Sequence, residues 1–359
     1  MSKDQLDSVL VSVHNGVGRL SLNRPRQINA LSHPMVGLLQ DALDRWRADP
    51  EVRVVVLTGE GERGFCAGGD IRAIYDDARA GTDTSLEFWA HEYRLNATLA
   101  TYPKPVVAFM AGIVMGGGVG LAVHASHRVV REDSVVAMPE VGIGFTPDVG
   151  GLFVLSRSPG QVGTHLTLTG DRMVAADALY AGFADHFIPA ARWEQALAAL
   201  ETTDPGAALR ALSTEPDEPC ELQPQREWID ACYAADRIED ILGSLAAHPD
   251  ERARATAERL RSLSPTALKV SLRALRAAAG DEDVSQTLQR DLRVSARSLA
   301  GHDFPEGIRA QVIDRDRTPR WLPAELGEVT DADVEAYFAD LGDRELQIPQ
   351  PSSPTTKES

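Results

Sequence analysis

The chain has 359 residues, of which 43% are hydrophobic and 25% are charged, as is typical of a globular protein rather than a disordered or fibrous one. Its 36 Lys and Arg against 53 Asp and Glu give a net charge of −17, which disfavours binding to nucleic acids and to anionic membranes. The three cysteines do not suggest a disulfide framework and the N-terminal segment MSKDQLDSVL does not resemble a secretory signal, so we expect a cytoplasmic protein.

Strands and helices are predicted to alternate through the first 200 residues. An Asn-Gly pair at 15–16, between two alternating apolar runs, predicts a hairpin over 8–23. The run VRVVVL at 52–57 is almost wholly apolar, as a strand buried on both faces should be. The other expected elements are helices over 29–47, 70–80, 84–101 and about 151–200, a strand over 105–109, a further strand unit at 127–137, and a short strand near 187–188. This alternation predicts an α/β fold.

The stretch 106–125 could be mistaken for a membrane span. It carries no Asp, Glu, Lys or Arg, and three of its glycines have the spacing seen in some membrane helices. However, its five glycines would weaken a single helix by roughly 1 kcal/mol each. We therefore predict a buried strand over 105–109, a turn over 112–116 and a helix over 117–125.

The character of the sequence changes after about residue 203. Residues 201–225 are rich in Pro, Glu and Asp, as in a linker, and residues 226–342 are almost entirely helical in pattern. Residues 343–359 hold three prolines among Ser, Thr and Gln and are expected to form a loose tail. The predicted organisation is therefore a core over 1–200 followed by this linker, helical region and tail.

Two glycine-rich segments, each at the end of an expected strand, are candidates for binding a negatively charged oxygen. They are Phe65–Asp70 (FCAGGD) and Gly116–Gly118. Each leaves backbone N–H groups unused by regular structure, and the second opens a helix whose N-terminus is partly positive. Two such N–H groups that converge would form an oxyanion hole, although glycines also serve simply to turn the chain.

A third segment, 138–151, supplies carboxylates. Glu140 and Asp148 lie in a loop that is otherwise apolar and rich in glycine. Carboxylates in such surroundings tend to have raised pKa values, as an acid–base group needs. In a chain with 53 acidic residues, two solvated loop acids are the alternative interpretation.

Two other kinds of site are considered and set aside. His124 and His127 form an HxxH pair, but no acidic or Cys partner accompanies them, so we expect no metal site. Cys66 has no His nearby in sequence and is expected to be a small buried residue rather than a nucleophile.

The segments taken together resemble the crotonase (enoyl-CoA hydratase/isomerase) superfamily. The similar stretches, in the order typical of that family, are LNRPRQINAL, VVVLTGEGERGFCAGGDI, KPVVAFMAGIVMGGGVGLA, MPEVGIGFTPDVGG and LTLTGDRMVAADALYAGFADHFIP. The resemblance implies a crotonase-like ββα superhelix core with a mostly α-helical C-terminal extension. It also implies that acyl-CoA thioesters bind with their carbonyl oxygen on the backbone N–H groups of Gly69 and Gly117.

The acidic residues within this resemblance favour one branch of the family. Hydratases carry a Glu three residues after the middle glycine of the triplet, where this chain has Gly120, and a second Glu that is present as Glu140. Asp148, where hydratases commonly carry Gly, and Glu92 on the helix 84–101 resemble the 3-hydroxyisobutyryl-CoA hydrolase branch. The segments DFPEGIRA at 303–310 and PRW at 319–321 are also similar to that branch.

The resemblance implies hydrolysis of a 3-hydroxyacyl-CoA thioester. The expected reaction is the conversion of 3-hydroxyisobutyryl-CoA to 3-hydroxyisobutyrate and CoA, a step of valine catabolism. Glu140 would act either as general base for water or as a nucleophile that forms a mixed anhydride. Asp148 would bind the substrate hydroxyl or water, and Glu92 would contact the acyl hydroxyl. A hydratase or isomerase on the same scaffold and a non-catalytic acyl-CoA-binding protein remain as alternatives.

The remaining expectations concern the CoA moiety. Asp70, Ile71 and Arg72 belong to the loop expected to bind substrate, with the adenine near 67–72. By the resemblance, Arg26, Arg72 and Lys269 are candidates for the CoA phosphates, although exposed cations of this kind are also ordinary surface residues. No cofactor is expected beyond the CoA of the substrate, and the family resemblance allows a homo-oligomer.

Overall fold

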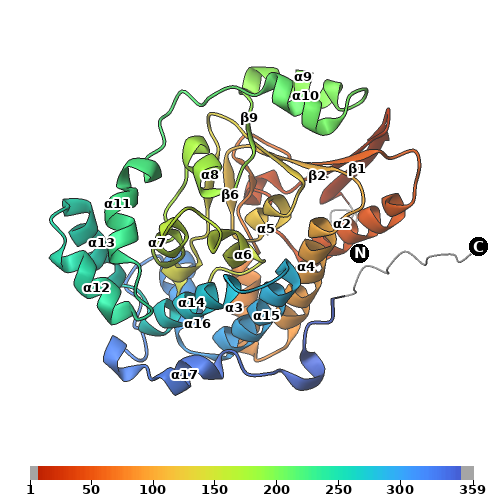
Figure 1. The fold of residues 1–359 in the computed structure, drawn as a ribbon. Helices are drawn as coiled ribbons and strands as arrows, with labels where there is room; N and C mark the ends of the chain where they lie inside the picture. The colour runs from red at the N-terminus through yellow and green to blue at the C-terminus, as the bar shows by residue number, and fades with distance from the viewer. Residues whose placement is uncertain (1–6, 349–359) are drawn as a thin grey trace, which may run out of the picture.

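The computed structural model describes residues 7–348. The first six residues of the N-terminal segment and residues 349–359 of the expected tail lie outside this range. A six-stranded sheet with the order β1-β2-β3-β5-β7-β9 forms one layer of the molecule, and a three-stranded sheet with the order β4-β6-β8 lies beside it (Figure 1). The strands of the larger sheet are β1 (Val9–His14), β2 (Val17–Leu22), β3 (Val54–Gly59), β5 (Val106–Met110), β7 (His127–Val130) and β9 (His186–Phe187).

The predicted hairpin is confirmed. β1 and β2 pair antiparallel, and Asn15 and Gly16 both take the left-handed backbone conformation, with φ of 48° and 84°, that a tight hairpin turn requires. All other pairs in the two sheets are parallel. The smaller sheet consists of β4 (Gly64–Cys66), β6 (Ile113–Met115) and β8 (Val135–Ala137).

The stretch 106–125 divides into β5, β6 and α5 (Gly117–Val123). The predicted turn over 112–116 was wrong, because residues 113–115 pair with β4 and β8 as a short strand. Within residues 7–348, none of the helices combines the length and the apolar character needed to cross a membrane.

Three helices and two short helical turns of the first half position the site. They are η1 (Pro25–Gln27), α2 (His33–Arg47), α3 (Ile71–Ala80), α4 (Thr84–Ala100) and η2 (Glu140–Ile143). The helix predicted from residue 29 begins at His33 instead. Asn29 has a left-handed backbone, φ 55°, and its buried side-chain amide donates to the carbonyl oxygens of Gly64 and Phe65 at 3.1 Å. Asn29 therefore fastens the loop before α2 to β4 rather than starting the helix.

The rest of the chain is mainly helical, as predicted. Its helices are α6 (Gly151–Leu155), α7 (Val162–Thr169), α8 (Ala175–Ala181), η3 (Ala190–Arg192), α9 (Trp193–Ala199), α10 (Pro205–Leu212), α11 (Leu222–Cys232), α12 (Ile238–Ala247), α13 (Glu251–Arg261), α14 (Pro265–Ala278), α15 (Val284–Ala300), α16 (Asp303–Ile308), η4 (Arg309–Ile313), η5 (Leu326–Glu328), α17 (Asp331–Ala336) and η6 (Gly342–Arg344). The expected linker 201–225 is not wholly irregular. It contains α10, which Asp204 caps through the N–H of Ala207, and the first turn of α11.

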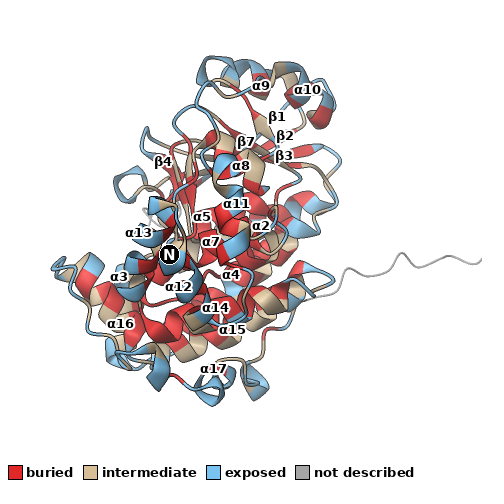
Figure 2. Ribbon diagram, turned by 60° about the vertical axis from the view of Figure 1, so that its left-hand side comes forward, coloured by how far each residue is buried: buried red, intermediate tan, exposed pale blue. Residues whose placement is uncertain are grey.

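Alternate residues of the central strands face two separate apolar clusters. Val54 and Val56 of β3 face a small cluster covered by α9 and α10, whereas Val55 and Leu57 face the main core. The main core runs without interruption from the first strands into the C-terminal helices, where α15 packs on α4 and α16 packs on α3 (Figures 1 and 2). The division of the chain into core and extension stays a prediction, since one apolar core serves both.

The last residues of the described chain are anchored. Leu346 is buried in the main core, and Glu345 forms an ion pair with Arg293 of α15 at 2.9 Å. The prediction of a loose tail from residue 343 was therefore wrong as far as residue 348.

Candidate active site

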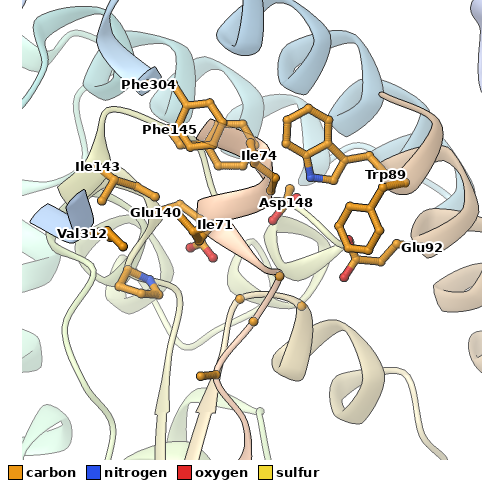
Figure 3. A pocket seen from close by; sticks show the side chains of 17 residues that line it. Ile71, Ile74, Trp89, Glu92, Glu140, Ile143, Phe145, Asp148, Phe304 and Val312 are labelled. Carbon is orange, nitrogen blue, oxygen red and sulfur yellow. The ribbon is translucent and has the colours of Figure 1, made fainter. Parts of the chain in front are cut away.

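The smaller sheet brings the three predicted segments to one place. Its strands β4, β6 and β8 run parallel, so the loops that follow them leave from the same edge of the sheet. These are the loop 67–70, the glycine triplet 116–118 and the loop 138–151. A pocket of about 220 Å³ lies between them and the helices α3, α4 and α16 (Figure 3). It is lined by Ala67, Gly68, Gly69, Ile71, Ile74, Phe88, Trp89, Glu92, Gly116, Gly117, Pro139, Glu140, Ile143, Phe145, Asp148, Phe304 and Val312.

The backbone N–H groups of Gly69 and Gly117 are both available to a ligand of this pocket. Leu31 donates to the carbonyl of Gly68 at 2.8 Å and accepts from the N–H of Asp70 at 3.0 Å, so the N–H of Gly69 between them points away from Leu31. Gly117 is the first residue of α5, where a backbone N–H has no partner within the helix. Within residues 7–348, neither N–H has an acceptor.

The close approach of the two loops requires glycine. A methyl group built on Gly68, whose φ is 106°, would lie 3.2 Å from the carbonyl oxygen of Met115 and 3.5 Å from the nitrogen of Gly117. A methyl group on Gly116 would lie 3.0 Å from Oε1 of Glu140, and one on Gly117 would collide with Oε1 of Glu92. The glycines therefore allow two carboxyl groups to rest directly on the backbone that carries the free N–H groups.

The position of the missing hydratase acid is closed. A methyl group on Gly120 would lie 2.6 Å from Cβ of Val149 and 3.1 Å from Nδ2 of Asn96. Both distances are shorter than ordinary packing allows. The loop after Asp148 thus fills the space that a side chain at residue 120 would need.

Three carboxyl groups of the pocket are buried, with Glu92 2% exposed and Glu140 and Asp148 7% exposed. Burial raises the pKa of Asp148 to about 6. Burial also raises the pKa of Glu140 well above its usual value, and the charge of Asp148 raises it further. The same two causes raise the pKa of Glu92. Asp148 can therefore gain or lose a proton close to neutral pH, whereas burial favours the protonated forms of Glu92 and Glu140.

Glu92 and Glu140 retain hydrogen-bonding capacity for a ligand. Among the described residues, Oε1 of Glu92 and Oε2 of Glu140 are buried without a hydrogen-bond partner. Buried carboxyl oxygens rarely remain unpaired, so these two atoms mark a place where a polar ligand or water binds. In Figure 3 the carboxyl groups of Glu92, Glu140 and Asp148 lie below the aromatic side chains of Trp89, Phe145 and Phe304.

Asp148 is held by residues that sequence reasoning missed. The hydroxyl of Tyr93 donates to Oδ2 of Asp148 at 2.6 Å and lies 2.8 Å from the hydroxyl of Ser295. The N–H of Gly150 donates to Oδ2 of Asp291 at 2.9 Å. No pattern in the sequence links a tyrosine of α4 to residues of α15, which lie about two hundred positions later.

The turn after Asp148 is strained. Val149 has φ 52° and Gly150 has φ 72°. A β-branched residue in the left-handed region costs on the order of 1–3 kcal/mol and persists only where its surroundings hold it. Nε2 of His124 donates to the carbonyl of Val149 at 2.8 Å, and Gly151 donates to the carbonyl of Asp148 at 2.7 Å.

An aromatic wall faces the acids. The rings of Trp89 and Phe145 stack with centroids 5.8 Å apart, and those of Phe145 and Phe304 with centroids 4.3 Å apart. Phe304 belongs to α16 and comes from the DFPEGIRA segment. In Figure 3 the rings of Trp89, Phe145 and Phe304 lie above the carboxyl groups, and we name these three rings the aromatic wall.

The expected CoA-binding loop lies at the pocket, with varied contacts. Ile71 lines the pocket, whereas Asp70 forms an ion pair with Arg24 at 3.1 Å. Arg72 donates to the carbonyl of Val312 at 3.2 Å and so joins α3 to η4. Arg26 is exposed on η1, close in sequence to Ile28, whose carbonyl accepts from the N–H of Ala67.

The structure does not bring Lys269 to this pocket, so it gives no support to the assignment of Lys269 to the CoA phosphates. Its ammonium donates to the carbonyl of Val329 at 2.9 Å and forms an ion pair with Glu239 at 2.7 Å. It lines a different groove, between α12, α14 and α17. The amphipathic pattern of α14 gave no sign of which side of the helix faces the substrate.

His124 was not expected to bind a metal and Cys66 was not expected to be a nucleophile, and both have partners within the fold. Burial lowers the pKa of His124 to about 4 and raises the pKa of Cys66 to about 12. The thiol of Cys66 donates to the carbonyl of Asn29 at 3.2 Å. Across residues 7–348, no group of three or more His, Cys, Asp and Glu side chains is arranged to hold a metal ion.

A parallel sheet edge that presents two free N–H groups to buried carboxyls is the arrangement of a crotonase-fold enzyme. A family model described as enoyl-CoA hydratase/isomerase matches residues 17–338. The chain belongs to that family.

Its relatives are similar over nearly their whole length. The chain is 39% identical over 355 residues to the mitochondrial 3-hydroxyisobutyryl-CoA hydrolase of Gallus gallus, covering 96% of this chain and 92% of that protein. It is 38% identical over 364 residues to the Homo sapiens protein of the same name, covering 97% and 93%. A solved structure of a carnitinyl-CoA dehydratase from Mycobacterium thermoresistibile superposes with a TM-score of 0.91 at 49% identity, covering 95% of this chain and 98% of that one.

The names of the curated relatives correct one expectation. Both relatives are named as mitochondrial proteins, which contradicts the expected cytoplasmic location. The expectation depended on the absence of a secretory pattern and on few cysteines, and neither feature distinguishes the cytoplasm from other reducing compartments.

Proposed function

We propose that this protein hydrolyses 3-hydroxyisobutyryl-CoA to 3-hydroxyisobutyrate and coenzyme A, a step of valine breakdown. The observation that carries the proposal is the pairing of Glu140 with Asp148 beside two free N–H groups, at a site where Val149 closes the position of a second hydratase acid. The curated relatives named as 3-hydroxyisobutyryl-CoA hydrolases support it.

The thioester carbonyl oxygen accepts hydrogen bonds from the N–H groups of Gly69 and Gly117. Negative charge develops on this oxygen when a nucleophile adds to the carbonyl carbon, so two fixed donors lower the barrier. Removing one donor of this kind typically costs about 10²–10³ in rate.

Glu140 carries the proton transfer or the nucleophilic attack. In the first route its carboxylate takes a proton from water as the water oxygen bonds to the carbonyl carbon, and the C–S bond then breaks to release CoA, whose sulfur receives the proton. In the second route a Glu140 oxygen bonds to the carbonyl carbon, the thiolate leaves, and water cleaves the resulting anhydride. The first route needs Glu140 to take up and release a proton, and its raised pKa makes the carboxylate a stronger base. The second route needs the carboxylate itself as the nucleophile.

Asp148 and Glu92 recognise the acyl hydroxyl. Asp148, with a pKa of about 6, is largely ionised at neutral pH and accepts a hydrogen bond from the substrate hydroxyl or from water. A site that leaves buried carboxyl oxygens unpaired when the hydroxyl is absent rejects such substrates strongly. Isobutyryl-CoA, which differs only by that hydroxyl, is therefore a poor substrate.

The test measures thiol release from 3-hydroxyisobutyryl-CoA, isobutyryl-CoA and 3-hydroxybutyryl-CoA. A parallel assay measures the hydration of crotonyl-CoA by the same protein. We expect fast release from the first and little hydration. Glu140→Gln should lower kcat by at least about 10³ while the KM changes little, because the amide keeps the shape of the side chain but cannot accept the proton. Glu62→Gln, on an exposed loop, is the control. Full activity of Glu140→Gln would overturn the assignment, and tight CoA binding without turnover would favour a binding protein.

A single turnover in ¹⁸O-labelled water separates the two routes. Label in the Glu140 carboxyl group supports the anhydride, and unlabelled protein excludes it. Crotonyl-CoA hydration faster than thiol release would instead favour a lyase activity, such as the dehydratase activity for which the Mycobacterium thermoresistibile protein is named.

CoA binding and assembly remain to be tested. We propose that Arg26 and Arg72 contact the CoA phosphates, since both belong to segments beside the pocket. Loss of either cation should raise the KM with kcat unchanged. A homo-oligomer is also a proposal, which sedimentation of the full chain tests.

A further inference from the structure

Two side chains of α15 reach the segment that carries Asp148. Asp291 and Ser295 lie one helical turn apart on the same face of α15, and both are buried, with exposed fractions of 3% and 0%. Asp291 accepts the N–H of Gly150, and Ser295 contacts the hydroxyl of Tyr93. Tyr93 in turn donates to Asp148, so the two side chains of α15 reach Asp148 indirectly, one through the turn that follows it and the other through Tyr93.

We propose that Asp291 and Ser295 are positioning residues that hold Asp148 in its reactive orientation, one through the backbone turn and the other through Tyr93. The inference builds on the proposed function, because Asp148 is assigned there to substrate recognition. It adds that helix α15, far from Asp148 in sequence, sets the geometry of that recognition.

The hydrogen bonds of Tyr93 have one direction. Its hydroxyl has a single proton, and the carboxylate of Asp148 can only accept, so Tyr93 donates that proton to Asp148. The hydroxyl of Ser295 must then donate to the oxygen of Tyr93. A hydroxyl that receives a hydrogen bond becomes a stronger donor, so Ser295 strengthens the bond from Tyr93 to Asp148. Loss of the Ser295 hydroxyl should therefore destabilise the ionised form of Asp148.

Asp291 acts on the backbone. The turn at Val149 and Gly150 has two successive residues with positive φ, and it aims the preceding carboxylate into the pocket. The N–H of Gly150 would be a buried donor without Asp291. An acceptor at residue 291 therefore keeps the turn in its left-handed form, and a neutral acceptor should serve as well as a charged one.

The other ionisable groups around Asp148 come from several elements. Glu92 and Tyr93 face it from α4, Glu140 from η2 and Asp291 from α15. Behind Asp291, Asp281 forms an ion pair with Arg290 at 2.7 Å, and His124 contacts the neighbouring carbonyl of Val149. A substitution at Ser295 removes none of these ionisable groups, and a substitution at Asp291 removes only Asp291 itself.

The first experiment measures Asp148 directly and needs no substrate. The full chain is labelled with ¹³C at the aspartate carboxyl carbons, and the signal absent from Asp148→Asn identifies Asp148. In the wild type this signal should titrate at about 6. Ser295→Ala should move the titration upward by about half a pH unit, the effect of weakening one hydrogen bond, and Ser295→Thr should restore it. Ser298→Ala, on the same helix face one turn further, is the matched control and should leave it unmoved.

The second experiment separates the acceptor from the charge at residue 291. Asp291→Ala should lower kcat/KM roughly tenfold, whereas Asp291→Asn, which keeps the acceptor, should stay within about twofold of the wild type. Circular dichroism confirms that each variant is folded. The acyl-CoA used is the one that the wild type hydrolyses fastest, so a failure of the proposed substrate does not affect this comparison.

Two results would overturn the inference. One is a titration midpoint of Asp148 in Ser295→Ala that equals the midpoints in the wild type and in Ser298→Ala. The other is an equal kcat/KM for folded Asp291→Ala and Asp291→Asn. Neither result bears on whether 3-hydroxyisobutyryl-CoA is the substrate, which the wild-type assay alone decides.

Discussion

Replacing Asp148 by Asn should make the folded protein more stable at neutral pH while it removes activity. Asp148 has a pKa of about 6 in the folded protein against an ordinary value of 3.8, because burial disfavours its charge. Between these two pH values the folded state holds more protons than the unfolded state. The free energy of unfolding therefore falls as the pH rises through this window. The asparagine side chain carries no charge to bury, and its oxygen can still accept the hydrogen bond from Tyr93.

The expected size follows from the difference in pKa. Above pH 7 the shift of about two units corresponds to about 3 kcal/mol, at 1.36 kcal/mol per unit. At pH 4.5 only about 1 kcal/mol of the difference remains, because the carboxyl is already mostly protonated in the folded state. Equilibrium urea denaturation of the wild type and Asp148→Asn at pH 7.5 and 4.5 measures both values. Asp148→Asn should be more stable at both, and by more at pH 7.5.

A second carboxylate supplies a control of opposite sign. Burial acts to raise the pKa of Asp171, but hydrogen bonds from His165 and Arg259 outweigh it and lower the pKa overall. Asp171→Asn should therefore destabilise the protein, and the loss should be nearly equal at pH 4.5 and 7.5, because a lowered pKa changes the free energy of unfolding only below the ordinary value of 3.8. If Asp148→Asn were no more stable than the wild type at pH 7.5, or if its gain did not shrink at pH 4.5, the reasoning about the buried carboxylate would be refuted.

Two further predictions concern packing at the pocket. Gly120→Ala should lower the free energy of unfolding by about 1–3 kcal/mol, because its methyl group meets Val149. Gly37→Ala, in open space on α2, should instead raise it by up to about 1 kcal/mol. Urea denaturation measures both values, and equal effects would contradict the closed position at residue 120. Phe304→Leu should shorten the aromatic wall and leave room for a longer acyl group. The ratio of kcat/KM for a 3-hydroxyacyl-CoA with one or two more carbons to kcat/KM for 3-hydroxyisobutyryl-CoA should rise about tenfold, which thiol release measures. An unchanged ratio would place the acyl group elsewhere.

Local patterns in the sequence predicted much of the fold. The Asn-Gly turn and the apolar run of β3 are short-range signals, and both elements form as expected. The short strand β6 was predicted to be a turn, because three residues between glycines show no alternation of their own. It becomes a strand only through pairing with β4 and β8, which lie tens of residues away. Asn29 shows the same limit, since its backbone is set by carbonyl groups of β4.

The candidate site divides in a similar way. Glu140 and Asp148 share one glycine-rich loop, so sequence proximity was enough to pair them. Glu92 was assigned only by family resemblance, since a single acid on a helix carries no local sign of where it points. Lys269 was assigned to the CoA phosphates and instead binds Glu239. Which side of a helix faces a ligand depends on the neighbouring elements, and these were not predictable from spacing.

The C-terminal helices are part of the site rather than an addition to it. Phe304 of α16 completes the aromatic wall. Asp291 of α15 accepts from the N–H of Gly150, and Ser295 of α15 contacts the hydroxyl of Tyr93. In a core without these helices, the strained turn at Val149 would lose one of the contacts that hold it, and Tyr93 would lose its buried donor. The carboxylate would then have little to keep it aimed at the pocket. We therefore propose that the helices beyond residue 200 are tied to the chemistry, since they hold the turn and the tyrosine that contact Asp148.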